Sequence, residues 1–102
     1  MIMSNAIWFI SYKLVEGADV SDFLLAQENC NNEVLSKKKG FISWQALKQE
    51  DTWVDLVTWE TMEDAMNGED DQGNIPPIAQ KFYDFIDPTS LQLQVYSVEK
   101  SY

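Results

Sequence analysis

Residues 41–60, FISWQALKQEDTWVDLVTWE, contain two runs of alternating side chains on either side of a short polar segment. The first run covers residues 41–48 and the second covers residues 52–60. A period of two predicts a β-strand, and a polar connection of a few residues predicts a hairpin. This stretch therefore predicts an antiparallel pair of strands at the centre of the chain.

A helix is predicted between residue 20 and Gly40, because apolar residues recur there at helical spacing. Asp19 is placed as its N-cap, and Asp22 three residues later resembles the second half of a capping box. The lysines at 37–39 suit the negative end of a helix dipole, and Gly40 is typical of a C-terminal stop. We expect the last turn of this helix to contain the three lysines.

The remaining segments complete a βαββαβ order. Residues 6–15 are β-branched or aromatic at nearly every position, which predicts a strand covered on both faces. Residues 61–66 begin with a Thr-x-x-Asp capping signal, and the polar segment 67–74 separates this helix from a second helical piece at 76–86. Residues 91–99 alternate and predict the last strand. We therefore predict an α+β, ferredoxin-like fold: a four-stranded antiparallel sheet with two helices on one face, the second helix broken.

The composition indicates one folded domain and excludes several kinds of partner. With 102 residues, 45% of them hydrophobic, the chain can form one core, so residues 1–102 are predicted to be a single domain. The net charge is −10, which opposes binding to nucleic acid and to anionic membrane surfaces. There is no His or Arg, and Cys30 is the only cysteine. We therefore expect no metal site, no internal disulfide and no cofactor.

The first residues lack the basic region of a signal peptide. The apolar stretch at 6–15 is too short to span a bilayer and contains Lys13. We therefore expect a cytoplasmic protein.

Both faces of the predicted sheet are apolar. Two helices can cover only one face, yet the strand at 6–15 carries large apolar groups at both parities. The third strand likewise places Trp53 and Val57 on one face and Val54 and Leu56 on the other. An exposed apolar face promotes aggregation, and packing against a second copy removes it. We predict a homodimer through the sheet face; the alternative is that a segment of the same chain covers it.

Residues 58–66, TWETMEDAM, together with the Gly40-Phe41 pair, resemble the dimeric α/β-barrel superfamily and, within it, the antibiotic-biosynthesis-monooxygenase-like domains. The family pattern is a Trp that ends the third strand, followed by a Ser or Thr cap, an acidic residue, an Ala and a large apolar residue. The resemblance implies a ferredoxin-like protomer whose sheet forms a barrel with that of its partner, and a pocket between sheet and helices. Members include cofactor-independent monooxygenases that act on phenolic polyketides, quinol oxidases and haem-degrading enzymes.

The haem-degrading branch fits this sequence poorly. Its motif residues are an Asn on the first strand, the Trp that ends the third strand, and a His on the second helix. Trp59 matches, but the first-strand position falls near Ile10 and the helix position falls on Gln80. Because the chain has no His to act as the axial ligand, we do not expect haem degradation.

Asp55 is the candidate catalytic residue. It lies in the middle of a strand between Val54 and Leu56, at the same parity as Trp53 and Trp59. If that face lines the pocket, the carboxylate is partly buried with a raised pKa and can accept a proton. If the hairpin lies at the sheet edge, Asp55 points to solvent or pairs with a lysine.

Aromatic side chains are the candidates for substrate binding. Trp59 is a candidate pocket wall, and Trp8, Tyr12 and Tyr83 could join it around a flat ligand. Gln80 could supply a hydrogen bond. The alternative for all of these residues is ordinary packing in the core or at an interface, or, for Gln80, an amide on a helix surface.

Two further features have plain structural interpretations. Cys30 lies on the apolar helix stripe with no His to activate it, which indicates a buried structural thiol rather than a nucleophile. The acidic residues 69–71 lack the alternating spacing of a calcium loop, which favours a solvated acidic loop. That loop could still cover the pocket.

Three functions follow from these observations. The first is a cofactor-free monooxygenase-like enzyme that acts on a small aromatic or quinone-like molecule near Trp59. The second is a module that binds a small ligand without turnover. The third is a structural dimerisation protein whose aromatic residues all pack in the core and interface. An enclosed cavity with Asp55, Gln80 or Tyr83 pointing inward would separate the first two from the third.

Overall fold

The computed structural model describes residues 4–70 and 73–102. It contains four strands, three α-helices and two 3₁₀ turns, in this order: β1 (Ala6–Tyr12), α1 (Val20–Glu33), η1 (Leu35–Lys37), β2 (Phe41–Gln49), β3 (Thr52–Trp59), α2 (Met62–Asn67), α3 (Pro77–Tyr83), η2 (Pro88–Ser90) and β4 (Gln92–Ser97). The strands form one antiparallel sheet in the order β2-β3-β1-β4. The predicted α+β architecture, with its interrupted second helix, is confirmed.

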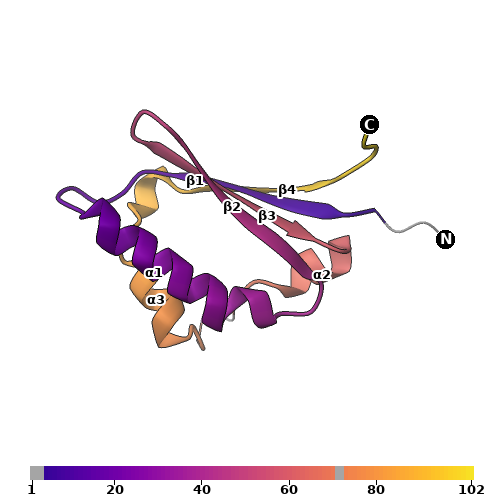
Figure 1. Ribbon diagram of the computed structural model, residues 1–102, viewed down its shortest axis with the longest axis horizontal. Helices are drawn as coiled ribbons and strands as arrows, with labels where there is room; N and C mark the ends of the chain where they lie inside the picture. Colours follow the sequence, from indigo (N-terminus) through magenta and orange to yellow (C-terminus); the bar gives the residue numbers. More distant parts are fainter. Residues whose placement is uncertain (1–3, 71–72) are drawn as a thin grey trace.

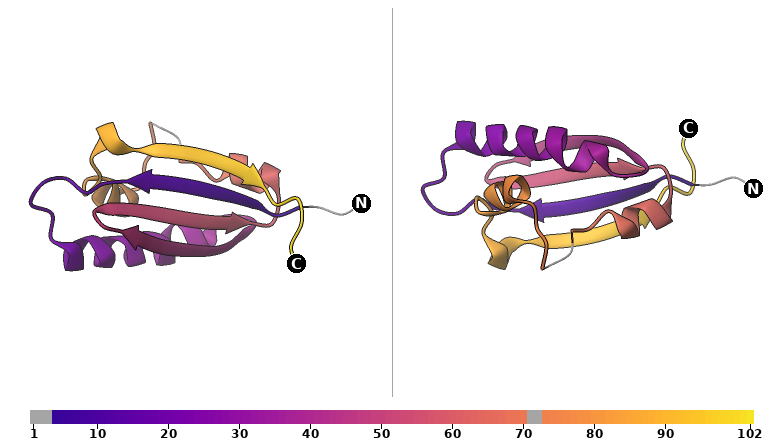
Figure 2. Two further views of the ribbon diagram at one scale, coloured as in Figure 1. Left: turned by 90° about the horizontal axis from the view of Figure 1, so that it is seen from above. Right: turned by 90° about the horizontal axis from the view of Figure 1, so that it is seen from below.

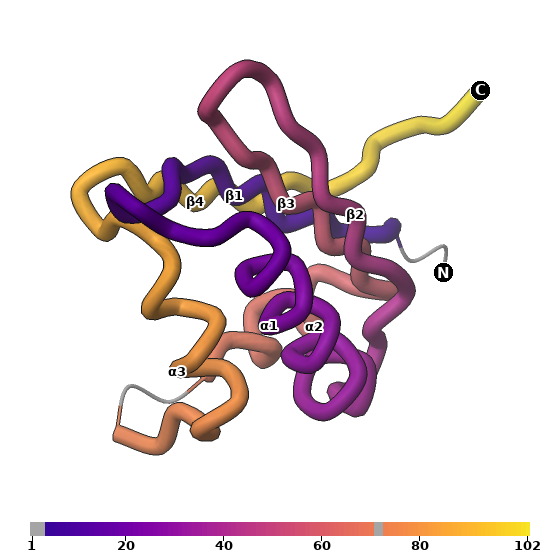
Figure 3. The backbone as a smooth tube through the Cα atoms, turned by 60° about the vertical axis from the view of Figure 1, so that its left-hand side comes forward, coloured from indigo at the N-terminus to yellow at the C-terminus, as the bar shows by residue number. Residues whose placement is uncertain are grey.

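The helices lie on one face of the sheet and leave the other face open (Figure 1). Helices α1 and α3 contact each other beneath the strands, as the tube in Figure 3 also shows. Seen from below, α1 lies under the β2 side of the sheet and α3 lies nearer the middle (Figure 2, right). The β4 side of the same face is therefore the least covered. None of the helices in the described part of the chain is long and apolar enough to cross a membrane.

Alternation in β3 determines which side chains reach the core. Trp53, Asp55, Val57 and Trp59 are all buried beneath the helices, while the residues between them are only partly buried. The predicted period of two is therefore confirmed. Because β3 is an inner strand, Asp55 cannot lie at a sheet edge.

Both predicted helix caps are present. The Asp19 carboxylate accepts a hydrogen bond from the Asp22 backbone N–H at 3.0 Å, and the Thr61 hydroxyl accepts one from the Asp64 N–H at 3.0 Å. Each cap satisfies a backbone donor that the helix itself leaves free.

The end of α1 differs from the prediction. The helix ends at Glu33, so the three lysines lie outside its last turn. Val34 leaves the helical conformation, at φ −122° and ψ −67°, and the η1 turn that follows buries Leu35 in the core. Gly40 then turns into β2 with φ +81°, and a Cβ at this position would collide with the Asp64 carboxylate.

Two clusters of buried side chains form the core. One lies beneath α1 and α3 and contains Tyr12, Phe23, Ala26, Cys30, Trp53, Ala79 and Phe82. The other lies toward α2 and contains Ala6, Trp8, Leu35, Val57, Trp59 and Ala65. The two clusters contact the same inner strands, β1 and β3, at different positions along them.

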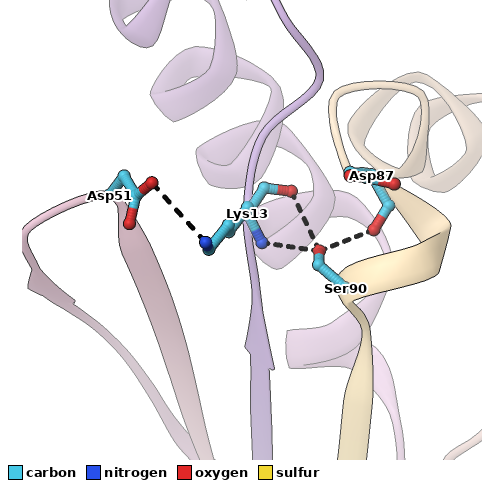
Figure 4. A network of polar contacts seen from close by, with 4 residues as sticks. All are labelled: Lys13, Asp51, Asp87 and Ser90. Atoms are coloured by element: carbon cyan, nitrogen blue, oxygen red, sulfur yellow. Dashed lines mark hydrogen bonds and ion pairs between the residues drawn. The ribbon is translucent and has the colours of Figure 1, made fainter.

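A polar network joins the end of β1 to the turn before β4 (Figure 4). The backbone N–H of Lys13 donates to the Ser90 hydroxyl at 2.8 Å, and Ser90 donates to the carbonyl of Asp87 at 2.7 Å. The Lys13 ammonium lies 3.7 Å from Asp51 at the hairpin tip. Residues 13–15 therefore pair with the segment between α3 and β4 instead of continuing β1. The strand predicted for 6–15 is shorter for this reason.

The open face of the sheet carries no charged side chain on its four strands. The register places on it eight neutral polar residues and six apolar or aromatic ones, the latter being Ile7, Phe9, Leu47, Val54, Leu56 and Tyr96. Phe9, Leu47 and Tyr96 are 37%, 44% and 51% exposed. A chain with net charge −10 thus keeps its charges off this face.

Candidate functional site

A cavity of about 410 Å³ lies between the helix-covered face of the sheet, α3 and the residues that follow α2. Most of its wall is apolar, with polar side chains from Tyr12, Asp55, Glu69, Asp70, Gln80 and Tyr83. Leu91 and Leu93, on the β4 side, line the cavity and are 48% and 45% exposed. The cavity therefore opens on the side of the sheet that the helices leave uncovered.

Asp55 is the most buried carboxylate that reaches this cavity, at 2% exposure. Its Oδ2 accepts a hydrogen bond from the Tyr12 hydroxyl at 2.8 Å, across the β1–β3 pair. Its Oδ1 accepts one from the Gln27 amide at 3.2 Å, from α1. Of the two positions considered for Asp55, the structure selects the buried one.

Burial controls the protonation of this pair. It raises the pKa of Asp55 to about 6, against the opposing effect of the Tyr12 hydroxyl and the Trp44 indole N–H, which favour the anion. The Trp44 N–H favours the Asp55 anion by its proximity, because it forms no hydrogen bond of ordinary geometry. Burial also raises the pKa of Tyr12, and the neighbouring Asp55 charge adds to this effect. Tyr12 is therefore a neutral donor, and Asp55 is the group that titrates.

A second phenol–carboxylate pair lies at the cavity wall formed by α3. The Tyr83 hydroxyl donates to Asp70 Oδ2 at 2.9 Å, and the Lys38 ammonium lies 2.9 Å from Asp70 Oδ1. Burial and the Asp70 carboxylate raise the pKa of Tyr83, so its hydroxyl keeps its proton. The side chain of Asp70 is only 12% exposed. The prediction of a solvated acidic loop is therefore wrong for Asp70, because Lys38 and Tyr83 draw this carboxylate inward; Asp71 lies outside the described residues.

Trp8 and Trp59 occupy different positions relative to the cavity. Trp8 lines it, donates its indole N–H to the Ala65 carbonyl at 3.0 Å, and packs on Trp59 with ring centroids 4.8 Å apart. Trp59 is completely buried behind Trp8 and is not among the lining residues. A Cβ at Gly68 would lie 2.5 Å from the Trp59 ring, so glycine lets the end of α2 close over this pair.

Gln80 reaches the cavity at its solvent side. It is exposed, and its amide donates to Asp84 at 2.8 Å within the same helical segment. The structure thus brings Trp8, Tyr12, Asp55, Gln80 and Tyr83 to one cavity. Their contact with a ligand stays a prediction.

Gln27, Lys38 and Asp70 were missed as site residues by the sequence analysis. Gln27 is a polar residue on the apolar stripe of α1, and that position was the signal for a buried role. Lys38 and Asp70 were assigned to a helix end and an acidic loop, and no local pattern pairs residues 32 positions apart. By contrast, Cys30 is buried as predicted, and burial raises the pKa of its thiol to about 11, ahead of a contribution from Asp70. It stays protonated at neutral pH.

No group of three or more candidate metal-ligating side chains occurs in residues 4–70 and 73–102.

No family model and no curated protein matches this sequence. Solved structures do match its fold. SnoaB, a cofactor-independent oxygenase from Streptomyces nogalater, superposes with a TM-score of 0.75 at 10% identity, over 96% of both chains. The chain has the same fold. A putative antibiotic biosynthesis monooxygenase from Bacillus cereus matches with a TM-score of 0.65 at 19% identity, over 97% of both chains.

A haem-degrading protein from Mycobacterium tuberculosis also matches, with a TM-score of 0.60 at 15% identity over 99% of this chain and 98% of that one. The predicted ferredoxin-like fold is therefore confirmed. One fold carries several activities, so these matches leave the chemistry to be argued from the site.

Proposed function

We propose that the protein is a cofactor-independent monooxygenase-like enzyme that acts on a small aromatic or quinone-like molecule held in the cavity. The observation that carries this proposal is the Asp55 carboxylate, buried against an apolar cavity of about 410 Å³ and hydrogen-bonded to Tyr12. A volume of this size fits a small organic ligand, and the apolar wall suits a flat ring. The fold shared with a cofactor-independent oxygenase supports the same conclusion.

Asp55 would act as the proton acceptor. With a pKa of about 6 it is ionised at neutral pH, yet basic enough to take a proton from a bound phenol. The phenolate that forms is electron-rich, and the substrate supplies all four electrons that reduce O₂. One oxygen atom joins the ring carbon and the other leaves as water with two hydrogens from the substrate, which becomes a quinone. The protein contributes the base, the orientation of the ring and the exclusion of water.

We further propose that the protein works as a homodimer joined through the open sheet face. The support is the combination of exposed Phe9, Leu47 and Tyr96 with the absence of charge on the strand residues of that face. A Leu56→Lys substitution would place a charge at the centre of the face, and analytical ultracentrifugation should then show monomers. A monomeric parent protein would contradict the proposal. We also propose that the protein is cytoplasmic.

Oxygen uptake tests the enzymatic proposal. The protein would be screened with phenols and quinols of one to three rings in an oxygen electrode, and Asp55→Asn should lower the rate at least 100-fold. Asp51→Asn is the matched control, because Asp51 is an exposed carboxylate at the tip of the same hairpin. Tight ligand binding without oxygen uptake would instead support the binding module, and an Asp55→Asn protein with full activity would exclude Asp55 as the base.

A further inference from the structure

We propose that Asp70 and Tyr83, positioned by Lys38, form a second hydrogen-bonding site in the cavity, which selects aromatic ligands that carry a second hydroxyl group. This inference rests on the proposed use of the cavity as a ligand site. It concerns a part of the wall distinct from the Tyr12–Asp55 pair.

Three separate segments assemble this second site. Lys38 follows η1, Asp70 follows α2, and Tyr83 is the last residue of α3. Asp70 accepts from Tyr83 at one oxygen and pairs with Lys38 at the other, both at 2.9 Å. Asp70 and Tyr83 line the cavity, whereas Lys38 lies behind them. Lys38 is therefore a positioning residue.

Lys38 differs from the other lysines of the chain. All seven lie in the described residues, and Lys38 alone is not exposed. Its side chain is 24% exposed, against 66% for Lys37 next to it. Withdrawing an ammonium from water is costly unless it is paired, and here the pairing holds one carboxylate at the cavity wall.

The free hydrogen-bonding capacity of this site is that of an acceptor. Among the described residues, each Asp70 oxygen has one side-chain donor and can accept a further hydrogen bond, and the Tyr83 oxygen can accept while its proton is donated to Asp70. A ligand hydroxyl satisfies such an acceptor, and an ether or a bare ring edge does not. A molecule whose first hydroxyl meets Asp55 would therefore gain affinity from a second hydroxyl at the Asp70–Tyr83 end.

Matched ligands measure this gain directly. Calorimetric titrations without oxygen would compare 2,6-dihydroxynaphthalene with 6-methoxy-2-naphthol, and 2,6-dihydroxyanthracene with its monomethyl ether. We expect the diol of at least one pair to bind about 10-fold more tightly, the effect of one hydrogen bond. The removal of oxygen keeps this result independent of turnover, so it can succeed or fail separately from the proposed enzymatic function.

Variants of Lys38 and Tyr83 test whether the tighter binding of the diol depends on this second site. Lys38→Met releases Asp70 and should bring the ratio of the two affinities to within about twofold of one. Tyr83→Phe leaves the Lys38–Asp70 pair in place, so Asp70 can still accept and the ratio should fall only in part. Lys38→Arg, which keeps the positive charge, should restore the ratio. Because each ratio compares two ligands on one protein, a loss of stability does not imitate the effect. A ratio near one in the parent protein, or one that Lys38→Met leaves unchanged, would overturn the proposal.

Discussion

The two phenol–carboxylate pairs of the cavity have nearly the same geometry and different electrostatics. Tyr12 lies 2.8 Å from Asp55, and Tyr83 lies 2.9 Å from Asp70. Asp70 also has a lysine at 2.9 Å, whereas no lysine of the described residues forms an ion pair with Asp55. Lys38 fixes Asp70 at the cavity wall, whereas burial raises the pKa of Asp55 to about 6. The same pair of side chains can therefore serve as a hydrogen-bonding site or as a base, according to its burial and to the charge beside it.

The largest expected effect is a gain in stability on Asp55→Asn at pH 8. The folded-state pKa of about 6 lies above the ordinary aspartate value of 3.8, so folding favours the protonated carboxyl. The stability from this group is fully present below pH 4 and is lost as the pH rises through 6. Each pH unit between the two pKa values is worth about 1.4 kcal/mol, which gives about 3 kcal/mol in total. Urea unfolding of both proteins at pH 4 and pH 8 measures the difference.

The expected pattern is a gain at pH 8 that disappears by pH 4. The same experiment on Asp51→Asn provides the reference for an exposed carboxylate. Equal gains for both variants would show that net charge, and not the burial of Asp55, is responsible.

The next effect is the pH dependence of the proposed reaction. If the Asp55 carboxylate takes the substrate proton, kcat/KM falls about tenfold for each pH unit below 6 and is level above pH 7. Oxygen uptake at several pH values measures this profile. A rate that is level down to pH 5 would remove Asp55 from the chemistry.

Tyr12→Phe should raise the pKa of Asp55 further, as burial does, but by a smaller amount. The Tyr12 hydroxyl lowers the pKa of Asp55, so its removal moves the midpoint of the pH profile upward from about 6. The variant should also lose about 1.5–3 kcal/mol of stability at pH 8, where the hydrogen bond is to a charged group, and less at pH 4. An unchanged midpoint would show that the hydrogen bond does not act on the titrating group.

The smallest effect on stability is expected at the Tyr83–Asp70 pair, where Lys38 forms its ion pair with Asp70. Lys38→Met should lower the free energy of unfolding by about 1 kcal/mol, because this ion pair is partly buried. Lys37→Met is the control: its ion pair with Glu33 is exposed, and the cost should stay below about 0.5 kcal/mol. Thermal unfolding of the two variants in parallel makes the comparison. Equal losses would mean that Lys38 has no special role at the cavity wall.

Local patterns predicted much of this fold. The alternation in β3 placed Asp55 beside Trp53 and Trp59 on one face, and the caps at Asp19 and Thr61 marked where two helices begin. These features depend on residues a few positions apart. The end of α1 was mispredicted because the burial of Leu35, a tertiary contact, terminates the helix before its lysines.

The candidate site was less predictable from the sequence, because it too depends on tertiary contacts. Asp55 could be named from its strand, but its burial depends on β3 being an inner strand. Trp59 carried the family pattern, yet the packing of Trp8 places it behind the cavity wall. Lys38, Asp70 and Tyr83 meet only after three segments have folded together.

The uncharged sheet face has a consequence for how two chains would meet. Each chain carries −10, all of it away from the strand residues of that face, so a dimer places two strongly acidic bodies back to back. Their mutual repulsion acts over a Debye length of about 30 Å in 0.01 M salt and about 10 Å in 0.1 M salt. Association through an apolar contact should therefore tighten as salt is added, which is the opposite of an assembly held by ion pairs. Dilution in low-salt buffer is the condition under which the proposed dimer would separate most readily.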